Sequence, residues 1–307
     1  MLTSVPHKPR IDETLMPQLR YNCPAREPTF TLMAGNNFSM TFPQPTPDPH
    51  LNVILHQLVT SVRDVLGNRF VAAYLQGSFA TGGWDRNSDV DFLIVVEEDL
   101  PDTLLPHLQD VHVQIYEIDS YWAKHLEGSY FPREWLKSPD PSYRPIVYID
   151  NGSRELIRSA HDNTLVVRWV VRECGITLAG PPPAALVDPV SADDLRREVF
   201  NTMRDWGEEI RTHQYQINNR WAQPFAVLSY CRMLHTLHTG RVDSKPAGAR
   251  WGMANLDPRW AGLIQRAWDE RPDQYLKVNL PADPRDVAQT LEFIEYALGL
   301  GKILVGS

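Results

Sequence analysis

The chain has 307 residues, 43% of them hydrophobic and 22% charged, a composition typical of a globular protein that buries a full core. Its length suits two ordinary domains or one large domain. The 30 basic and 38 acidic residues give a net charge of −8, which argues against a general nucleic-acid binder, because such proteins neutralise phosphates with an excess of Lys and Arg.

The first elements can be read in chain order. Prolines recur through residues 1–45 and leave no periodic apolar segment, so we expect a tail that is disordered or loosely packed. From 51 to 66 apolar residues fall at helical spacing, and Gly67 supplies a stop signal. Residues 70–75 predict a short strand. The continuous apolar run at 90–96 predicts a strand buried on both faces.

The segment 104–122 has two interpretations. Its apolar residues keep steps of three and four, which favours a helix, but 111–115 also alternate, so a strand over 111–118 is the competitor. Further along the chain we expect short strands at 126–131 and 146–149, a helix over 162–173 and a short apolar run at 176–178.

The triple proline at 181–183 makes a stiff extended break and a plausible domain boundary. Beyond it the pattern is nearly all helical, with about five helices between 191 and 300. Their expected starts are a capping box at Ser191 and Ser-x-Pro or Asp-Pro signals at Ser244 and Asp283. The sequence thus predicts an α/β region followed by an all-α region.

The segment from Gly77-Ser78 to Asp89-Val90-Asp91 carries the chemistry. Small residues that end a strand before a helix suit a triphosphate held close to backbone N–H groups. Two aspartates at i and i+2 of a strand point to one face and can converge on hard cations. Gly-Ser turns and paired aspartates also occur in ordinary turns. However, Asp91 leads directly into an apolar strand, where a carboxylate is costly unless it is paired or binds metal.

The joint pattern resembles the signature of the DNA-polymerase-β-type nucleotidyltransferase superfamily. Segments 126–133, 175–183 and 224–232, with the short motifs at 239–240 and 244–246, resemble its aminoglycoside adenylyltransferase group, of the streptomycin/spectinomycin type, and the likeness covers about residues 50–270. This resemblance implies a mixed sheet flanked by helices over 46–183, and a C-terminal helical bundle over 184–307 that closes on it.

The resemblance also implies the activity. AMP would pass from ATP to a hydroxyl of a small acceptor, for which an aminoglycoside is one candidate, with two Mg²⁺ ions held by Asp89 and Asp91. Superfamily members use a third carboxylate to complete the metal site or to take the proton of the acceptor. Glu127, 36 residues after Asp91, fits by position, and Glu117 is the reserve if 111–118 is a strand.

The resemblance assigns further residues to the nucleotide. Gly77, Ser78 and Ser88 would lie against its phosphates. Lys245 matches a family lysine that contacts the triphosphate, and its place in the first turn of a helix is otherwise slightly unfavourable. Arg232 interrupts an apolar helix, so it either faces the cleft or pairs with a core carboxylate.

One departure from the family weakens the drug assignment. Members that act on streptomycin and spectinomycin carry acidic residues near the start of the helix at 224–240, where they receive cationic groups of the drug. Residues 218–222 contain no carboxylate here. Glu208 and Glu209 on the preceding helix are substitutes, unless they belong to a solvated face. AMP transfer is therefore better indicated than the drug.

Two rival functions follow from the same residues. One is a catalytically silent nucleotide sensor, which has no need of a base such as Glu127. The other is a helical-domain ribonuclease that uses Arg232 and His238, a spacing that also arises by chance, and the acidic balance disfavours RNA. No apolar run reaches the roughly 20 residues of a membrane helix, and no signal-peptide pattern is evident. We therefore expect a cytoplasmic enzyme whose partners are a nucleoside triphosphate and a small acceptor.

Overall fold

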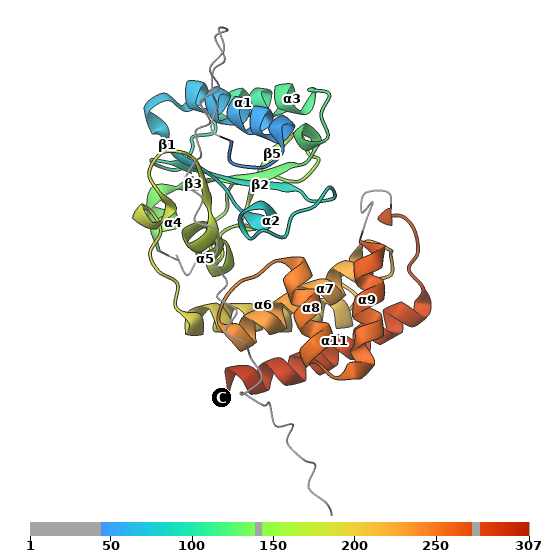
Figure 1. The fold of residues 1–307 in the computed structure, drawn as a ribbon. Coiled ribbons are helices and arrows are strands. Elements are labelled where there is room, and N and C mark those ends of the chain that lie inside the picture. Colours follow the sequence, from blue (N-terminus) through green and yellow to red (C-terminus); the bar gives the residue numbers. More distant parts are fainter. Residues whose placement is uncertain (1–43, 139–142, 272–276, 307) are drawn as a thin grey trace, which may run out of the picture.

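The computed structural model describes residues 44–138, 143–271 and 277–306. The tail expected over 1–45 lies outside these residues, except for its last two positions. Figure 1 shows that the first half of the described chain forms a sheet covered by helices, and that the second half is helical.

The sheet has six strands in the order β5-β4-β3-β2-β1-β6. The pair β2–β3 is parallel and the other four pairs are antiparallel, so the expected mixed sheet is confirmed. The strands are β1 (Phe70–Leu75), β2 (Val90–Val96), β3 (Leu126–Pro132), β4 (Ile146–Ile149), β5 (Leu156–Ser159) and β6 (Ile176–Ala179).

Helices cover both faces of this sheet (Figure 1). The side chains of Phe92 and Ile94 pack with α1 and α3, whereas those of Leu93 and Val95 lie on the opposite face with α4 and α5. All four are fully buried, as the apolar run predicts. The helices are α1 (Pro49–Leu66), α2 (Gly77–Ala80), α3 (Leu105–Tyr116), α4 (Arg133–Lys137) and α5 (Leu165–Cys174).

Within the segment 104–122, residues Leu105–Tyr116 form the helix α3, so the helix ends before the expected 122 and the competing strand interpretation is wrong. Leu108, Val111 and Ile115 lie on one face of this helix and are buried with α1, which a strand could not achieve at that spacing. Glu117 is the C-terminal cap residue of α3, is exposed and pairs with Arg154 at 3.1 Å. Glu117 therefore takes no part in the sheet and is not the third carboxylate of the site.

One other boundary differs from expectation, and one strand was not expected. The helix α5 begins at Leu165 and not at 162, because the side chain of Thr164 caps it by accepting a hydrogen bond from the N–H of Val167. The edge strand β5 was not predicted at all. Its side chains are half-buried or exposed, so it lacks the apolar alternation by which strands are recognised.

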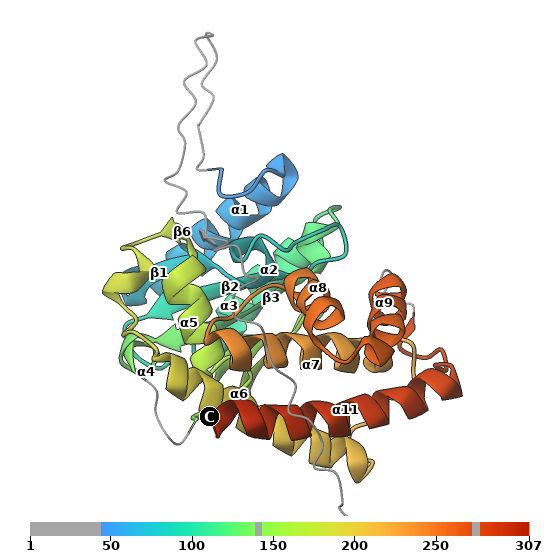
Figure 2. The same cartoon turned by 60° about the horizontal axis from the view of Figure 1, so that its bottom comes forward.

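The second half of the chain is built around one central helix. Tyr230, Cys231 and Leu234 of α7 are fully buried, and α7 contacts the four other helices (Figure 2). The capping signals at Ser191, Ser244 and Asp283 begin helices as predicted. In the part of the chain that the structure describes, the helices are α6 (Ala192–Arg211), α7 (Ala222–Thr239), α8 (Lys245–Asn255), α9 (Ala261–Glu270) and α11 (Pro284–Val305).

The two halves are joined by hydrogen bonds at the start of α5. The Glu198 carboxylate on α6 accepts hydrogen bonds from the N–H groups of Leu165, at 2.7 Å, and Val166, at 3.1 Å. A carboxylate at a helix N-terminus is stabilised by the helix dipole. None of the helices among the described residues combines the length and the apolar character needed to cross a membrane.

Candidate active site

A cleft of about 1940 Å³ lies between the sheet and the helical half. It is bounded on one side by the ends of β2 and β3 and on the other by α7 and α8. The cleft brings together the eight residues assigned from the sequence to the metal and the nucleotide: Gly77, Ser78, Ser88, Asp89, Asp91, Glu127, Arg232 and Lys245.

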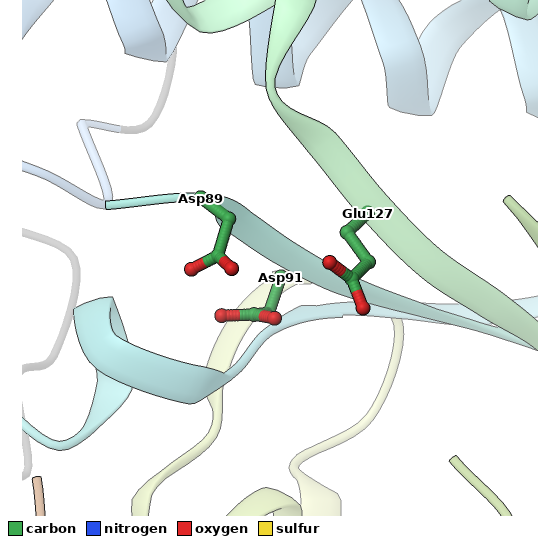
Figure 3. Close-up of side chains that lie close together, drawn as sticks. All are labelled: Asp89, Asp91 and Glu127. Atoms are coloured by element: carbon green, nitrogen blue, oxygen red, sulfur yellow. The ribbon is translucent and has the colours of Figure 1, made fainter. Parts of the chain in front are cut away.

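Three carboxylates meet at one end of the parallel strands. Asp91 of β2 is paired with Glu127 of β3 in the sheet register, and Asp89 stands just before β2, with the buried Val90 between the two aspartates. One oxygen of each carboxylate lies within 4.8 Å of the others. Figure 3 shows the three side chains pointing toward one another. This is the convergence that the i, i+2 spacing predicts.

The backbone of Gly77 lies directly against this cluster. Its φ of +59° is in the left-handed region, and an added Cβ would come within 1.8 Å of Oδ2 of Asp91. The neighbouring N–H of Gln76 donates a 2.8 Å hydrogen bond to the backbone carbonyl of Asp91. Position 77 therefore requires glycine for two reasons, the backbone conformation and the space that Asp91 fills.

Ser78 is the second residue of the short helix α2, beside the carboxylates. Its hydroxyl oxygen is buried and has no hydrogen-bond partner among the described residues. Buried polar groups are nearly always hydrogen-bonded, so an unpartnered hydroxyl at the wall of a cleft indicates a missing partner. A phosphate oxygen is a suitable acceptor for this hydroxyl.

Ser88 shapes the turn that precedes Asp89. Its hydroxyl accepts a 2.9 Å hydrogen bond from the N–H of Asp85, and its own N–H donates to the Asp85 carbonyl at 3.0 Å. The Asp85 carboxylate also accepts a hydrogen bond from the N–H of Asn87, at 2.9 Å. Because the Ser88 hydroxyl uses its oxygen as an acceptor here, its proton is still free to donate to a ligand.

Burial and neighbouring negative charge raise the pKa values of Asp91 and Glu127. Burial, together with the charges of Asp89 and Glu127, raises the pKa of Asp91 well above its usual value. Burial and the neighbouring carboxylates raise the pKa of Glu127 to about 7, although a hydrogen bond from Tyr148 opposes the shift. Ionised carboxylates this close together need a cation, and oxygen ligands of this kind suit Mg²⁺.

This crowding predicts a pH dependence of stability in metal-free buffer. The pKa of Glu127 is 4.5 ordinarily and about 7 in the fold, so between these values the folded state binds more protons. The free energy of unfolding should therefore fall on the order of 3 kcal/mol as the pH rises through this range. Urea unfolding of the wild type and of Glu127→Gln at pH 5 and 8 measures it. Equal pH dependence in both proteins would contradict the assignment.

Two cations face the carboxylates from the helical half. Arg232 of α7 lines the cleft and forms no ion pair with any described residue, so the alternative of a core carboxylate partner is not seen. Burial lowers its pKa, whereas the charges of Asp91 and Asp89 oppose that change. Lys245, at the first turn of α8, lies with its ammonium 5.5 Å from the ring centre of Phe225.

Sequence reasoning missed the residues that surround Glu127. The hydroxyl of Tyr148 lies 2.7 Å from Glu127 Oε1 and 3.0 Å from Asp150 Oδ1. Asp162 is buried and accepts a 2.6 Å hydrogen bond from the Ser129 hydroxyl. The only available signal was the predicted strand 146–149, and nothing in the sequence tells which strand it pairs with.

Other candidates lie elsewhere in the structure. Glu208 is exposed and pairs with Arg211, and neither Glu208 nor Glu209 lines the cleft. His238 packs beside Trp251 at a ring distance of 5.6 Å. Six residues of an α-helix correspond to about 240°, so Arg232 and His238 point to different sides of α7. The ribonuclease pairing therefore has no common site.

The fold and the site define a nucleotidyltransferase. Residues 57–157 match the family model of the nucleotidyltransferase domain, and residues 185–295 match that of the aminoglycoside adenylyltransferase C-terminal domain. The chain belongs to the aminoglycoside adenylyltransferase-like group of the nucleotidyltransferases, and it is an adenylyltransferase.

Known relatives agree with this family. The chain is 28% identical to spectinomycin 9-adenylyltransferase of Staphylococcus aureus, over 69% of this chain and 81% of that protein. It is 22% identical to the aminoglycoside (3'') (9) adenylyltransferase of Klebsiella pneumoniae, over 80% and 92% of the two chains. The crystal structure of a spectinomycin adenyltransferase from Enterococcus faecialis with ATP and spectinomycin has the same fold, with a TM-score of 0.59 at 16% identity, over 81% of this chain and 98% of that one.

Proposed function

We propose that this protein transfers AMP from ATP to a hydroxyl of a small acceptor and releases pyrophosphate. One observation carries the proposal: three carboxylates converge within 4.8 Å against a glycine turn, and across the same cleft they face two cations that form no ion pair with a described residue. Transfer of a phosphoryl group needs both: carboxylates that bind metal ions, and cationic side chains that bind the phosphates.

The three carboxylates fit a magnesium site. Their oxygens are hard ligands and they are partly buried, and burial together with their mutual repulsion raises the pKa values of Asp91 and Glu127. We propose that Asp89 and Asp91, with Glu127, hold two Mg²⁺ ions. Bound there, the metal would neutralise triphosphate charge and stabilise the transition state.

The residues of the chain have distinct roles in this proposal. The hydroxyl of Ser78 and the first N–H groups of α2 donate to phosphate oxygens, and Ser88 donates from the turn before Asp89. The acceptor oxygen attacks the α-phosphorus and gives its proton to Glu127. The bond from the α-phosphorus to the bridging oxygen breaks, and pyrophosphate leaves against Arg232 and Lys245.

Tyr148 has a testable part in positioning Glu127. Its hydroxyl has one proton and lies within hydrogen-bond distance of two carboxylates, so it restrains the orientation of Glu127. Tyr148→Phe should lower kcat about 10- to 100-fold, the usual cost of losing such a supporting contact. Tyr74→Phe is the control, because it removes a buried hydroxyl that donates to the Pro181 carbonyl at 2.8 Å, away from the cluster. Equal kcat values in the two variants would refute the role.

We propose a cationic acceptor, for which an aminoglycoside-type antibiotic is the leading candidate. The relatives are named for spectinomycin and aminoglycosides. In this chain, Asp150 and Asp162 line the cleft beside Glu127, where they can receive ammonium groups that the start of α7 cannot. An antibiotic-resistance role follows if such a drug is the substrate.

Transfer of label from α-labelled ATP tests the function directly. The purified protein is incubated with Mg²⁺ and with spectinomycin, streptomycin and other aminoglycosides, and neutral sugars serve as controls. We expect a labelled, cationic product and equimolar pyrophosphate. Binding of ATP without pyrophosphate release for any acceptor would instead support the catalytically silent sensor.

The domain division and location remain part of the proposal. We propose a nucleotidyltransferase domain over 46–183 that carries the carboxylates, and a helical domain over 184–307 that carries the cations. Family-model boundaries at 57–157 and 185–295 are compatible with this division. We place the enzyme in the cytoplasm, where ATP is available.

A further inference from the structure

Arg271 is a charged residue in the cleft that the motifs do not include. It follows the last residue of α9, only 8% of its surface is exposed, and it lines both the main cleft and a smaller recess beside Lys245. Its guanidinium lies 4.6 Å from the ring centre of Trp268. Such a contact restricts the orientations open to the guanidinium.

The partners of Arg271 are incomplete. Nη2 forms an ion pair with the Asp85 carboxylate, which comes from the other half of the molecule. Nε is buried and has no hydrogen-bond partner among the described residues. Burial of the group also lowers its pKa. A guanidinium presents five donors, so a single carboxylate leaves room for another anion.

The position of Arg271 relates it to the nucleotide-binding loop. Asp85 belongs to the turn that Ser88 closes, directly before Asp89. Gly83, two residues before Asp85, packs against Ser244 at the start of α8. An added Cβ at position 83 would lie 2.2 Å from the Ser244 Cβ. Arg271 thus lies where the phosphate-side loop meets the start of α8, at the cationic end of the cleft.

We propose that Arg271 binds the terminal phosphates of the nucleotide and that Asp85 holds the guanidinium in place until they arrive. This inference rests on the proposed function, in which a nucleoside triphosphate occupies the cleft. Arg binds phosphate through two parallel N–H donors, and the unpartnered Nε supplies one of them. The phosphates therefore compete with Asp85 for Arg271, while Lys245 acts beside it as a point charge.

A purely structural role for the ion pair makes a different prediction. If Arg271 and Asp85 only hold the two halves together, removing either partner should have the same effect, and removing both should add nothing. If Arg271 binds phosphate, its removal weakens binding, whereas Asp85→Asn does not, because it removes a competing charge. Asparagine at 85 keeps the side-chain oxygen that accepts from the N–H of Asn87.

The experiment measures binding of α,β-methylene-ATP and of AMP with Mg²⁺ by calorimetry. Arg271→Met should weaken α,β-methylene-ATP binding about 10- to 100-fold and leave AMP binding unchanged, because AMP lacks the terminal phosphates. Asp85→Asn should bind the analogue at least as tightly as the wild type. Arg266→Met, which breaks an exposed ion pair with Asp286 outside the cleft, is the matched control.

The outcomes separate this inference from the proposed function. Equal weakening in Arg271→Met and Asp85→Asn, with no further loss in the double variant, would overturn it in favour of a structural ion pair. Equal losses for the analogue and for AMP would overturn it too. Arg271→Lys serves if the Met variant does not fold: it keeps the charge but loses the paired N–H donors, so it should weaken binding of the analogue and leave AMP binding unchanged, and unchanged binding of the analogue would overturn the inference. A wild type that binds neither nucleotide would refute the proposed function itself.

Discussion

Replacing Asp91 with asparagine is expected to abolish AMP transfer and to stabilise the metal-free fold. Asparagine has nearly the same volume but loses the charge that would hold a divalent cation, so the rate should fall by more than about 100-fold, the upper cost of losing a mere supporting contact. Burial raises the pKa of Asp91, so its ionised form opposes folding at neutral pH. Removal of that charge should therefore raise stability when no metal is present.

The measurement pairs label transfer with thermal unfolding, with and without Mg²⁺. The wild type should gain stability from Mg²⁺, and Asp91→Asn should gain much less. Asp64→Asn, an exposed change on α1, should match the wild type in both assays. A variant at position 91 that transferred AMP at near-wild-type rates would remove the metal assignment.

The second large effect is expected at Gly77, where alanine should remove activity and destabilise the fold. A Cβ there would overlap Oδ2 of Asp91, and the residue would have to adopt a φ of +59°. The backbone conformation alone costs roughly 1–2 kcal/mol for an L-residue. The overlap must displace either Asp91 or the turn that holds Ser78, so the geometry of the site is lost.

Gly82→Ala separates these two causes. Gly82 has a φ of +73°, but an added Cβ there meets nothing within 4 Å. In urea unfolding, Gly82→Ala should lose a similar free energy of unfolding from the strained backbone, while it retains most of the AMP-transfer activity. If Gly77→Ala were no less active than Gly82→Ala, the close approach of Asp91 to the turn would have no role in catalysis.

Local patterns in the sequence were enough for several features. Two aspartates that lead into an apolar strand must point to one face of it, and a helix-capping residue acts on its own first turn. The strands β1 to β4 and the starts of α6, α8 and α11 were predictable for this reason. The edge strand β5 was not, because its side chains are too exposed to alternate in polarity.

The carboxylate cluster also had a part that sequence patterns could identify and a part that they could not. The i, i+2 spacing determined that Asp89 and Asp91 share a face. Glu127, the third carboxylate, could be named only from family resemblance, because the position of Glu127 opposite Asp91 depends on the parallel pairing of β2 with β3. Strand pairing is a long-range property, and no local period encodes it.

The sequence by itself determined the kind of chemistry, because small residues at a turn and carboxylates on a strand have a local geometry that follows from chain stereochemistry. Only the tertiary structure decided which distant groups complete the site. Tyr148 contacts Glu127 from a neighbouring strand, and Arg271 lines the cleft from the end of α9. Their contacts depend on how strands pair and helices pack, and these arrangements are set by burial summed over the whole chain.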